Sequence, residues 1–266
     1  MNVPLFSVKN IIKNFPAASG GEPFAALKNI SFDIAEGQCL MIAGSNGSGK
    51  TLLMRIIAGL LDPGSGEVWF RGQPLFTGKK SQRRETERSL RRELGLVFQD
   101  AEVQIVGETV AEDAAFGPEN LGFNADEIQA RVDGTLAALG LAEKRDNSPR
   151  RLSGGEKRRL AIAGVLAMGC STVIMDEPFA NLDSPGVIST LGIIRDLKNS
   201  GRTVIILTHE LEKALALADR LIILHQGCIC SDGDPADVLG RLDPAWGVRD
   251  PRRNYAAIED CTWLEN

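Results

Sequence analysis

The sequence lacks several features that would point to other classes of protein. Its 30 basic residues are outnumbered by 35 acidic ones, and this mildly negative balance disfavours general nucleic-acid binding. Its five cysteines have no zinc-like spacing and mostly lie in apolar segments, so we interpret them as reduced cytosolic thiols. No signal peptide and no internal repeat is visible, so we expect a single copy of one cytosolic domain.

A membrane-spanning segment is also missing. The uncharged stretch from residue 160 to residue 175 is shorter than the 18 or so apolar residues that a spanning helix needs. Small and polar residues at 169–172 interrupt it, so we predict a helix end followed by a buried strand. The length of 266 residues suits one large α/β domain with a helical insertion.

A glycine-rich segment from Gly44 to Thr51 fits the phosphate-binding pattern G-x-x-x-x-G-K-[ST] at every position. Its members are Gly44, Ser45, Asn46, Gly47, Ser48, Gly49, Lys50 and Thr51. An apolar strand is expected before it and a helix after it, so its backbone N–H groups can surround phosphates at a helix N-terminus. Lys50 is expected to bridge the β- and γ-phosphates of ATP, and Thr51 to bind Mg²⁺. The alternative, a turn that binds nothing, is disfavoured by the complete motif in this context.

Two acidic residues, Asp176 and Glu177, end an apolar run that begins at Thr172. A run without polar alternation is typical of a parallel strand covered on both faces. Ligands of α/β folds bind at the carboxyl ends of such strands. We therefore expect Asp176 to hold Mg²⁺ through a coordinated water, and Glu177 to polarise the water that attacks the γ-phosphate.

A second anion site is predicted at Leu152–Glu156. Ser153 and Glu156 form a capping box, and Gly154 and Gly155 leave the first N–H groups of the following helix bare. This segment has no lysine and no Mg²⁺ ligand of its own, so it completes a site rather than forming one. Two such sites in one chain imply that two domains face each other and close on ATP.

As a set, these motifs resemble the ATPase subunits of ABC transporters, from Val3 to about Leu239. Gly44 to Thr51 matches the Walker A motif, Leu152 to Glu156 the signature motif, and Val173 to Glu177 Walker B with its catalytic glutamate. The resemblance implies an α/β fold of the P-loop NTPase type, with a mostly parallel central sheet, an antiparallel N-terminal β subdomain and an inserted helical subdomain. It also implies a transport-coupled, Mg²⁺-dependent ATP hydrolase.

Four further residues take roles from this resemblance. Gln99 matches the Q-loop, where its amide contacts Mg²⁺ and the attacking water. His209 matches the switch histidine that contacts the γ-phosphate. Asp183 belongs to a segment similar to the D-loop, although Asn181 stands where the family more often has a small residue. Phe15 resembles the aromatic residue that stacks on adenine, usually tyrosine, and the alternative is a core phenylalanine.

A finer resemblance is to the ATPases of energy-coupling-factor importers, including the cobalt and nickel type. Residues 97–105, 109–122 and 164–168 carry it, although those importers usually have Asn-Pro where this chain has Asp100-Ala101. It implies a second ABC ATPase as partner, identical or related, and integral membrane subunits bound through the Gln99–Gly122 region. We expect a peripheral protein on the cytoplasmic face of the membrane, with no nucleic-acid partner.

The expected organisation is an ABC ATPase domain over residues 1–240 and a C-terminal tail over 241–266. The helical subdomain is expected from about residue 99 to residue 150, or to 165 when the helix after the signature motif is included. Helices are predicted over 124–139 and from residue 184, and a locally basic helix over 79–92 is interpreted as a solvated face. The tail is expected either to pack at a dimer interface or to be partly disordered.

Two other classes of protein share part of this set of motifs. A soluble ABC ATPase without a transporter, such as an iron–sulfur assembly factor, shares the core motifs, but the pattern at 109–122 favours transport. A small-molecule P-loop kinase has no need of the signature motif. The sequence leaves the transported substrate open among cobalt, nickel, biotin and other vitamins.

Overall fold

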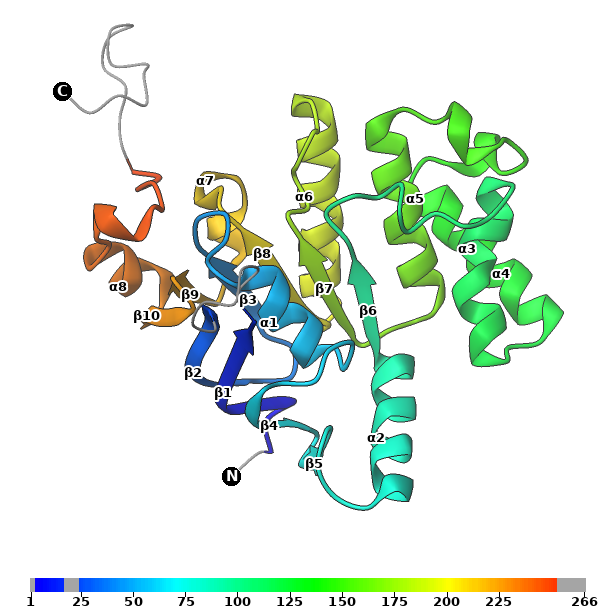
Figure 1. Cartoon of the computed structure of the whole chain (residues 1–266). Helices are drawn as coiled ribbons and strands as arrows, with labels where there is room; N and C mark the ends of the chain where they lie inside the picture. Colours follow the sequence, from blue (N-terminus) through cyan, green and yellow to red (C-terminus); the bar gives the residue numbers. More distant parts are fainter. Residues whose placement is uncertain (1–2, 17–23, 253–266) are drawn as a thin grey trace, which may run out of the picture.

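A computed structural model describes residues 3–16 and 24–252 of the chain. Its centre is a six-stranded sheet in the order β10-β9-β3-β8-β7-β6, shown in Figure 1. The strands are β3 (Cys39–Ala43), β6 (Leu94–Val97), β7 (Thr172–Asp176), β8 (Thr203–Thr208), β9 (Arg220–His225) and β10 (Cys228–Gly233). All neighbours are parallel except β10, which pairs antiparallel with β9 at the edge. The predicted mostly parallel sheet is therefore confirmed.

A second sheet of four strands is antiparallel, in the order β2-β1-β4-β5. It consists of β1 (Phe6–Phe15), β2 (Phe24–Ile34), β4 (Ser65–Phe70) and β5 (Gln73–Pro74). Together with α1 (Lys50–Ile57), it encloses a core that includes Leu40 and Ile42 of β3. Met41 and Ala43, the alternate residues of β3, belong to a second core on the other face. Side chains of a strand alternate between faces, so β3 joins both cores.

The second core is covered by α5 and α6 and continues into the helical subdomain. That subdomain contains α3 (Val110–Leu121), α4 (Ala125–Ala138) and α5 (Gly154–Ala167), with short 3₁₀ turns at Ala142–Lys144 and Pro149–Arg151. Capping boxes begin all three helices, with Thr109, Asn124 and Ser153 as N-caps. The helix predicted over 124–139 and the one beginning at residue 184, α6 (Ser184–Asn199), are both present.

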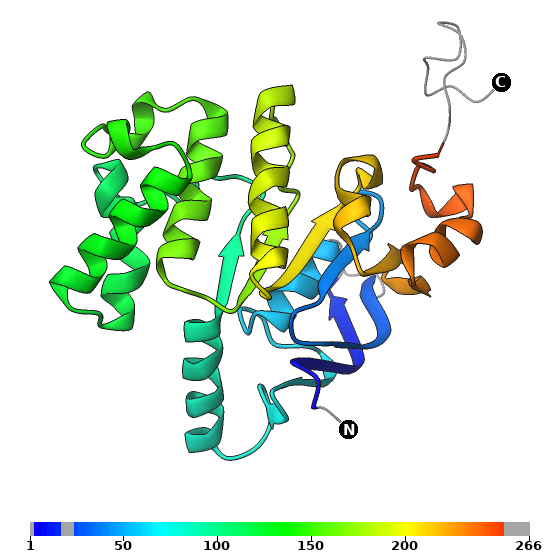
Figure 2. The same cartoon turned by 180° about the vertical axis from the view of Figure 1, so that it is seen from behind.

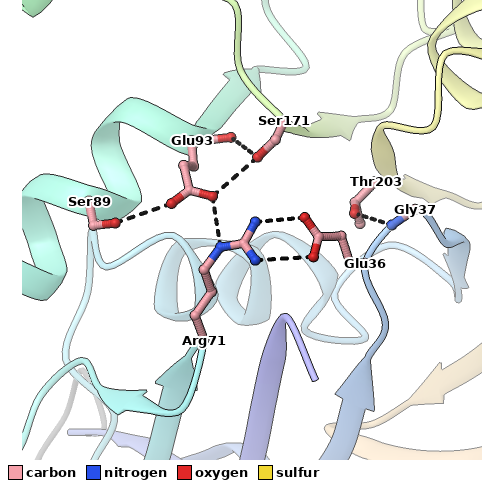
Figure 3. A network of polar contacts seen from close by, with 7 residues as sticks. All are labelled: Glu36, Gly37, Arg71, Ser89, Glu93, Ser171 and Thr203. Atoms are coloured by element: carbon pink, nitrogen blue, oxygen red, sulfur yellow. Dashed lines mark hydrogen bonds and ion pairs between the residues drawn. The ribbon is translucent and has the colours of Figure 1, made fainter. Parts of the chain in front are cut away.

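The remaining helices are α2 (Lys80–Glu93), α7 (Leu211–Ala214) and α8 (Pro235–Gly240). Figures 1 and 2 show α2 extending below the central sheet, in line with β6. A polar network holds its C-terminal end (Figure 3). Arg71 donates to both carboxylate oxygens of Glu36, at 3.1 and 2.7 Å, and its Nε donates to Glu93 at 2.8 Å. The Arg71 guanidinium lowers the pKa of Glu36, and the ion pair of Arg71 with Glu93 ties the end of β4 to α2.

The C-terminal segment from residue 241 packs against the body of the chain as far as the structure describes it. A 3₁₀ turn, Pro244–Trp246, follows α8. Val248 is buried in the second core, and the partly buried Trp246 packs against that core. Residues 253–266, with Cys261 and Trp263, lie outside the described residues.

Two further properties follow from the described ranges. Within them, no helix is both long and apolar enough to cross a bilayer. The four cysteines there are free, and burial raises the pKa of Cys39 and of Cys170 to about 11. These two thiols are therefore protonated and unreactive at neutral pH.

Candidate functional site

The carboxyl ends of β3, β8 and β7 lie next to one another and carry most of the predicted site. Ala43 of β3 is in register with Thr208 of β8, and Leu207 of β8 with Asp176 of β7. The Glu177 N–H donates to the Leu207 carbonyl at 2.8 Å, which extends this pairing past the end of β7. The loop after β3, the two acidic residues and His209 therefore meet at one edge of the sheet.

The loop after β3 needs glycine at particular positions. Gly49 has φ +108° and directly precedes α1, so its backbone is in the left-handed region that favours glycine. A Cβ on Gly44 would lie 2.1 Å from the Leu224 carbonyl oxygen, and one on Gly49 would lie 2.8 Å from Leu27 Cδ2. The loop is thus packed closely between β2 and β9, and it leads directly into a helix N-terminus.

Lys50 is buried within this loop, with its side chain 6% exposed. Its Nζ donates to the Gly44 carbonyl at 2.6 Å and to the Ser45 carbonyl at 3.2 Å. It also lies 3.4 Å from Glu177 Oε1. The cation is therefore held where the loop, α1 and the end of β7 converge.

Asp176 and Thr51 form the next contact. Thr51 Oγ1 donates to Asp176 Oδ2 at 2.7 Å, while Asp176 Oδ1 and Ser48 Oγ are buried with no hydrogen-bond partner among the described residues. Burial raises the pKa of Asp176, and the Thr51 hydrogen bond opposes that rise. Hydroxyl and carboxylate oxygens are ligands that Mg²⁺ prefers, so these residues fit the expected ion.

Glu177 links the lysine to the histidine. Its Oε2 lies 3.0 Å from His209 Nδ1, and the His209 N–H approaches the same oxygen at 3.4 Å. Glu177 has φ +45°, a conformation that is strained for a residue with a side chain and tends to occur at functional sites. The carboxylate is consequently fixed between a cation and an imidazole.

Gln99 follows β6, the neighbour of β7, and its side chain forms no hydrogen bond with that cluster among the described residues. It is exposed and lines a cavity of about 350 Å³ together with Gly154 and Asn181. The buried Arg158 of α5 donates to the carbonyls of Phe98 and Gln99, at 2.6 Å each. Burial lowers the pKa of Arg158. Our sequence analysis missed Arg158, although its place in the basic run after the signature motif was a signal for it.

The segment after Gln99 has two more anchors that we did not anticipate. The Gln104 side chain accepts from the Phe98 N–H at 3.1 Å and donates to the Ala161 carbonyl at 3.3 Å. The Asp113 carboxylate accepts from the N–H groups of Val106 and Gly107, at 2.7 and 3.0 Å. Both anchors depend on contacts between segments distant in the chain or across a loop, which local patterns do not reveal.

The signature segment begins α5 as predicted. Ser153 Oγ accepts from the Glu156 N–H at 3.3 Å, and Glu156 accepts from the Ser153 N–H at 2.9 Å. Lys144 pairs with Glu156 and, with Ser153, lowers its pKa to about 2. A Cβ on Gly154 would meet nothing within 4 Å among the described residues, and one on Gly155 would meet only Arg159 Nη1 at 4.0 Å. Packing among the described residues therefore does not require glycine at either position.

The signature segment and the phosphate loop of the same chain are far apart. Strands β8 and β7 lie between β3 and β6, and α5 belongs to the helical subdomain beyond β6 (Figure 1). Three strand spacings alone amount to roughly 14 Å. The two glycine-bearing segments thus present separate surfaces of one chain.

Phe15 and Asp183 occupy positions of a different kind. Phe15 pairs with Phe24 at the end of β1, and both rings are exposed, at 41% and 65%. Asp183 is exposed and accepts from the Gly186 N–H at 3.0 Å as the N-cap of α6. Phe15 is accordingly a surface residue rather than a core phenylalanine, and its neighbour Phe24 is a second exposed ring that our sequence analysis did not single out.

The C-terminal segment also reaches the phosphate loop, which sequence reasoning did not anticipate. The Trp246 carbonyl lies 3.2 Å from His225 Nδ1 at the end of β9. Gly247 follows with φ +68°, and a Cβ there would lie 3.1 Å from Ser45 Cβ. The C-terminal segment thus contacts the phosphate loop at Ser45, its second residue.

A profile described as ABC transporter matches residues 27–180. The chain belongs to the ABC transporter family. Together with the solved ABC cassettes described next, this membership identifies the chain as an ABC-type ATP hydrolase.

One curated relative of this ABC ATPase is the energy-coupling factor transporter ATP-binding protein EcfA of Methanocaldococcus jannaschii. It is 38% identical over 219 residues, covering 82% of this chain and 77% of the relative. A solved structure, CbiO1 from Clostridium perfringens, part of the ABC transporter complex CbiONQ, aligns with a TM-score of 0.76 and 32% identity, covering 89% and 91% of the two chains. An ATP-binding cassette dimer in a post-hydrolysis state with ADP and Pi aligns with a TM-score of 0.76 and 27% identity, covering 86% and 98%.

Replacing Gly247 tests whether the C-terminal segment positions the phosphate loop of the ABC ATPase. In Gly247→Val, the strained backbone and the contact with Ser45 should displace the loop and weaken ATP–Mg²⁺ binding by about tenfold, measured by titration calorimetry. Gly240→Val is the matched control, because a Cβ on Gly240 meets nothing within 4 Å of the described residues. Unchanged affinity in Gly247→Val would show that this contact has no bearing on the loop.

Proposed function

We propose that this chain is the ATP-binding and hydrolysing subunit of an importer of the energy-coupling-factor type. It would power uptake of a metal ion, cobalt or nickel, or of a vitamin, from the cytoplasmic face of the membrane as a peripheral subunit. The names of the M. jannaschii and C. perfringens proteins support this subgroup. The choice of substrate would belong to a separate membrane protein.

The observation that carries the hydrolytic role is the position of Glu177 between Lys50 and His209. Lys50 now satisfies its charge with the loop carbonyls and with Glu177. The β- and γ-phosphate oxygens of ATP would replace these partners, because charge-assisted bonds to phosphate are stronger than those to neutral carbonyls. Glu177 would then be free to accept a proton from the attacking water, with His209 orienting the carboxylate and contacting the γ-phosphate.

Thr51 and Asp176 would hold Mg²⁺, with Gln99 joining them when its loop moves toward the site. The ion supplies neutralisation of the charge on the β- and γ-phosphates. Phe15 would stack on the adenine ring, and the exposed Phe24 beside it widens the aromatic surface. Along the chain, these residues lie between Phe15 at the end of β1 and Asp176 at the end of β7.

The second half of the nucleotide site would come from another ABC ATPase. Gly154 and Gly155 leave their N–H groups uncovered, although a side chain would fit at either position in this chain. Glycine there is explained if the γ-phosphate held by a partner approaches the backbone closely. A head-to-tail pair with two-fold symmetry would form two such composite sites, with Ser153 and Asp183 also facing the partner's nucleotide.

A groove on the helical side is suited to a membrane subunit. It has a volume of about 570 Å³ and lies between the end of α1, the end of α2, and helices α3 and α5. Leu60 and Phe116 line it and are 57% and 53% exposed. Phe116 belongs to the Gln99–Gly122 region, which the network of Arg158 and Gln104 ties to α5. A helix of the membrane subunit that inserts here would sense movement of the Gln99 loop.

Glu177→Gln tests the hydrolytic role. The amide keeps the shape of the side chain but cannot accept the proton, so ATP binding should persist while single-turnover hydrolysis falls by 100-fold or more, on the order of a general-base contribution. An ATP-bound dimer should accumulate in size-exclusion chromatography, because hydrolysis normally opens it. Glu212→Gln, a change at an exposed residue outside the site, is the control. Turnover at the wild-type rate would refute the assignment of Glu177.

Gly155→Asp tests the composite site. A carboxylate against phosphate oxygens is repelled in a partly desolvated site, so the variant should bind ATP normally as a monomer yet fail to dimerise and hydrolyse. Mixing it with Lys50→Ala places both lesions in one composite site and leaves the other intact, so part of the hydrolysis should return. Gly134→Asp on α4, also open around its Cα, should behave as wild type. Loss of ATP binding by the Gly155→Asp monomer would mean that the signature segment acts within its own chain.

Phe116→Glu tests the groove. A buried carboxylate facing an apolar helix is unfavourable, so the variant should lose the integral membrane subunits that co-purify with the affinity-tagged wild type, while its ATP binding stays unchanged. Val3→Glu alters another exposed apolar residue, 67% exposed, and should retain them. Equal recovery with all three proteins would exclude the groove as the docking site.

A further inference from the structure

Helix α2 presents a basic face that the other described residues leave uncovered. Figures 1 and 2 show the helix extending beyond both sheets. Only Thr86 and Leu90 are buried along its length. These two residues define the inner side of the helix, and the opposite side faces outward.

The outward side is predominantly basic. Its basic residues recur at intervals of three or four positions, with two adjacent ones in the last turn, which places them on one face at 3.6 residues per turn. They are Lys80, Arg84, Arg88, Arg91 and Arg92, all exposed. The face runs for about 18 Å along the helix axis at 1.5 Å per residue.

The acidic residues of α2 do not neutralise this face. Glu93 turns inward and pairs with Arg71, as Figure 3 shows. Glu87 is half-buried, and Glu85 lies at the flank of the face. In the sequence, basic and acidic residues alternate over this helix, a pattern that we interpret as a solvated face. In the folded chain, the basic residues lie on one face and the acidic residues lie at its flanks.

The charges of this face are also unpaired within the described chain. None of the five basic residues forms an ion pair there, whereas Arg71, Lys157, Lys198 and Arg220 all do. Like charges four residues apart repel one another and weaken a helix. A chain with 35 acidic and 30 basic residues has carboxylates available, yet none of those in residues 3–16 and 24–252 pairs with this face.

We propose that the basic face of α2 binds the anionic lipid headgroups of the membrane at which this ATPase works. The orientation of α2 relative to the bilayer rests on the proposed function. Leu90 and Arg91 at the end of α2 line the same groove as Phe116, so a membrane subunit seated in the groove brings α2 toward the bilayer. The outward face contains no apolar residue, which suits adsorption to headgroups rather than insertion.

Lipid phosphate fits this face better than nucleic-acid phosphate. Single-stranded nucleic acids are bound by basic residues combined with aromatic platforms, and residues 79–93 contain no aromatic side chain. The overall negative charge also opposes adsorption to a long polyanion. A flat headgroup surface can contact one helix face while the acidic remainder of the protein stays away.

Vesicle sedimentation of the full chain tests the proposal. Wild type should bind vesicles with about one-third phosphatidylglycerol in phosphatidylcholine, should not bind pure phosphatidylcholine, and should dissociate as salt shortens the Debye length. Each basic residue near an anionic surface contributes roughly fivefold in partitioning. The triple variant Lys80→Gln/Arg84→Gln/Arg88→Gln should therefore bind on the order of 100-fold more weakly.

A charge-matched variant provides the control. Lys28→Gln/Arg195→Gln/Arg241→Gln removes the same charge from exposed positions elsewhere and should bind as wild type. An equal loss in both variants, no binding by wild type, or tighter α2-dependent binding to RNA than to vesicles would each overturn the proposal. ATP hydrolysis and co-purification with membrane subunits should be unchanged in the α2 variant in solution. A wild type that neither hydrolyses ATP nor co-purifies with membrane subunits would instead count against the proposed function.

Discussion

The parallel register of β3, β8 and β7 is the constraint on which the rest of the site depends. Each strand ends at the same edge of the sheet, and a predicted site residue lies at or directly after each end. The pairing of Asp176 with Leu207, continued by the Glu177 N–H, sets the height of both carboxylates relative to the phosphate loop. A slip of one residue in a strand would turn its side chains to the other face. The relative positions of the site residues are therefore set by the backbone hydrogen bonds between these strands.

Burial of charge gives this edge its chemical character. Lys50, Asp176 and Glu177 are all nearly inaccessible, and buried charges are costly unless they are paired. Lys50 and Glu177 meet each other, while Asp176 has one hydroxyl partner and a pKa raised by burial. An arrangement that is only partly satisfied by the protein itself favours a ligand that brings both negative oxygens and a cation. ATP with Mg²⁺ has this combination of charges.

The helical subdomain carries the signature segment and links it to the Gln99 loop beside the strand ends. Arg158 joins α5, which begins at the signature segment, to the backbone of Gln99, and Gln104 joins the same helix to the end of β6. Because these hydrogen bonds connect packed elements, a displacement of the Gln99 loop would be carried to the start of α5. The groove beside Phe116 and the basic face of α2 adjoin the same elements.

The sequence alone determined the phosphate loop, the capped helix of the signature segment and the buried strands of the central sheet. These features are local, because phosphate binding needs successive backbone N–H groups and capping boxes span only four residues. The resemblance to ABC transporter ATPases, carried by the same motifs, also gave the family that the comparisons establish. The roles of the individual site residues stay predictions until the variants above are measured.

Only the tertiary structure showed which distant groups meet. The contacts of Arg158 with Gln99, of Gly247 with Ser45 and of Arg71 with Glu93 each join residues more than twenty positions apart. The same packing decided that Glu93 turns inward and that the remaining charges of α2 form one unpaired basic face. Composition and periodicity describe how a segment behaves alone, whereas side-chain partners depend on the packing of the whole chain. That is why the chemistry of the loop could be derived from the sequence and its surroundings could not.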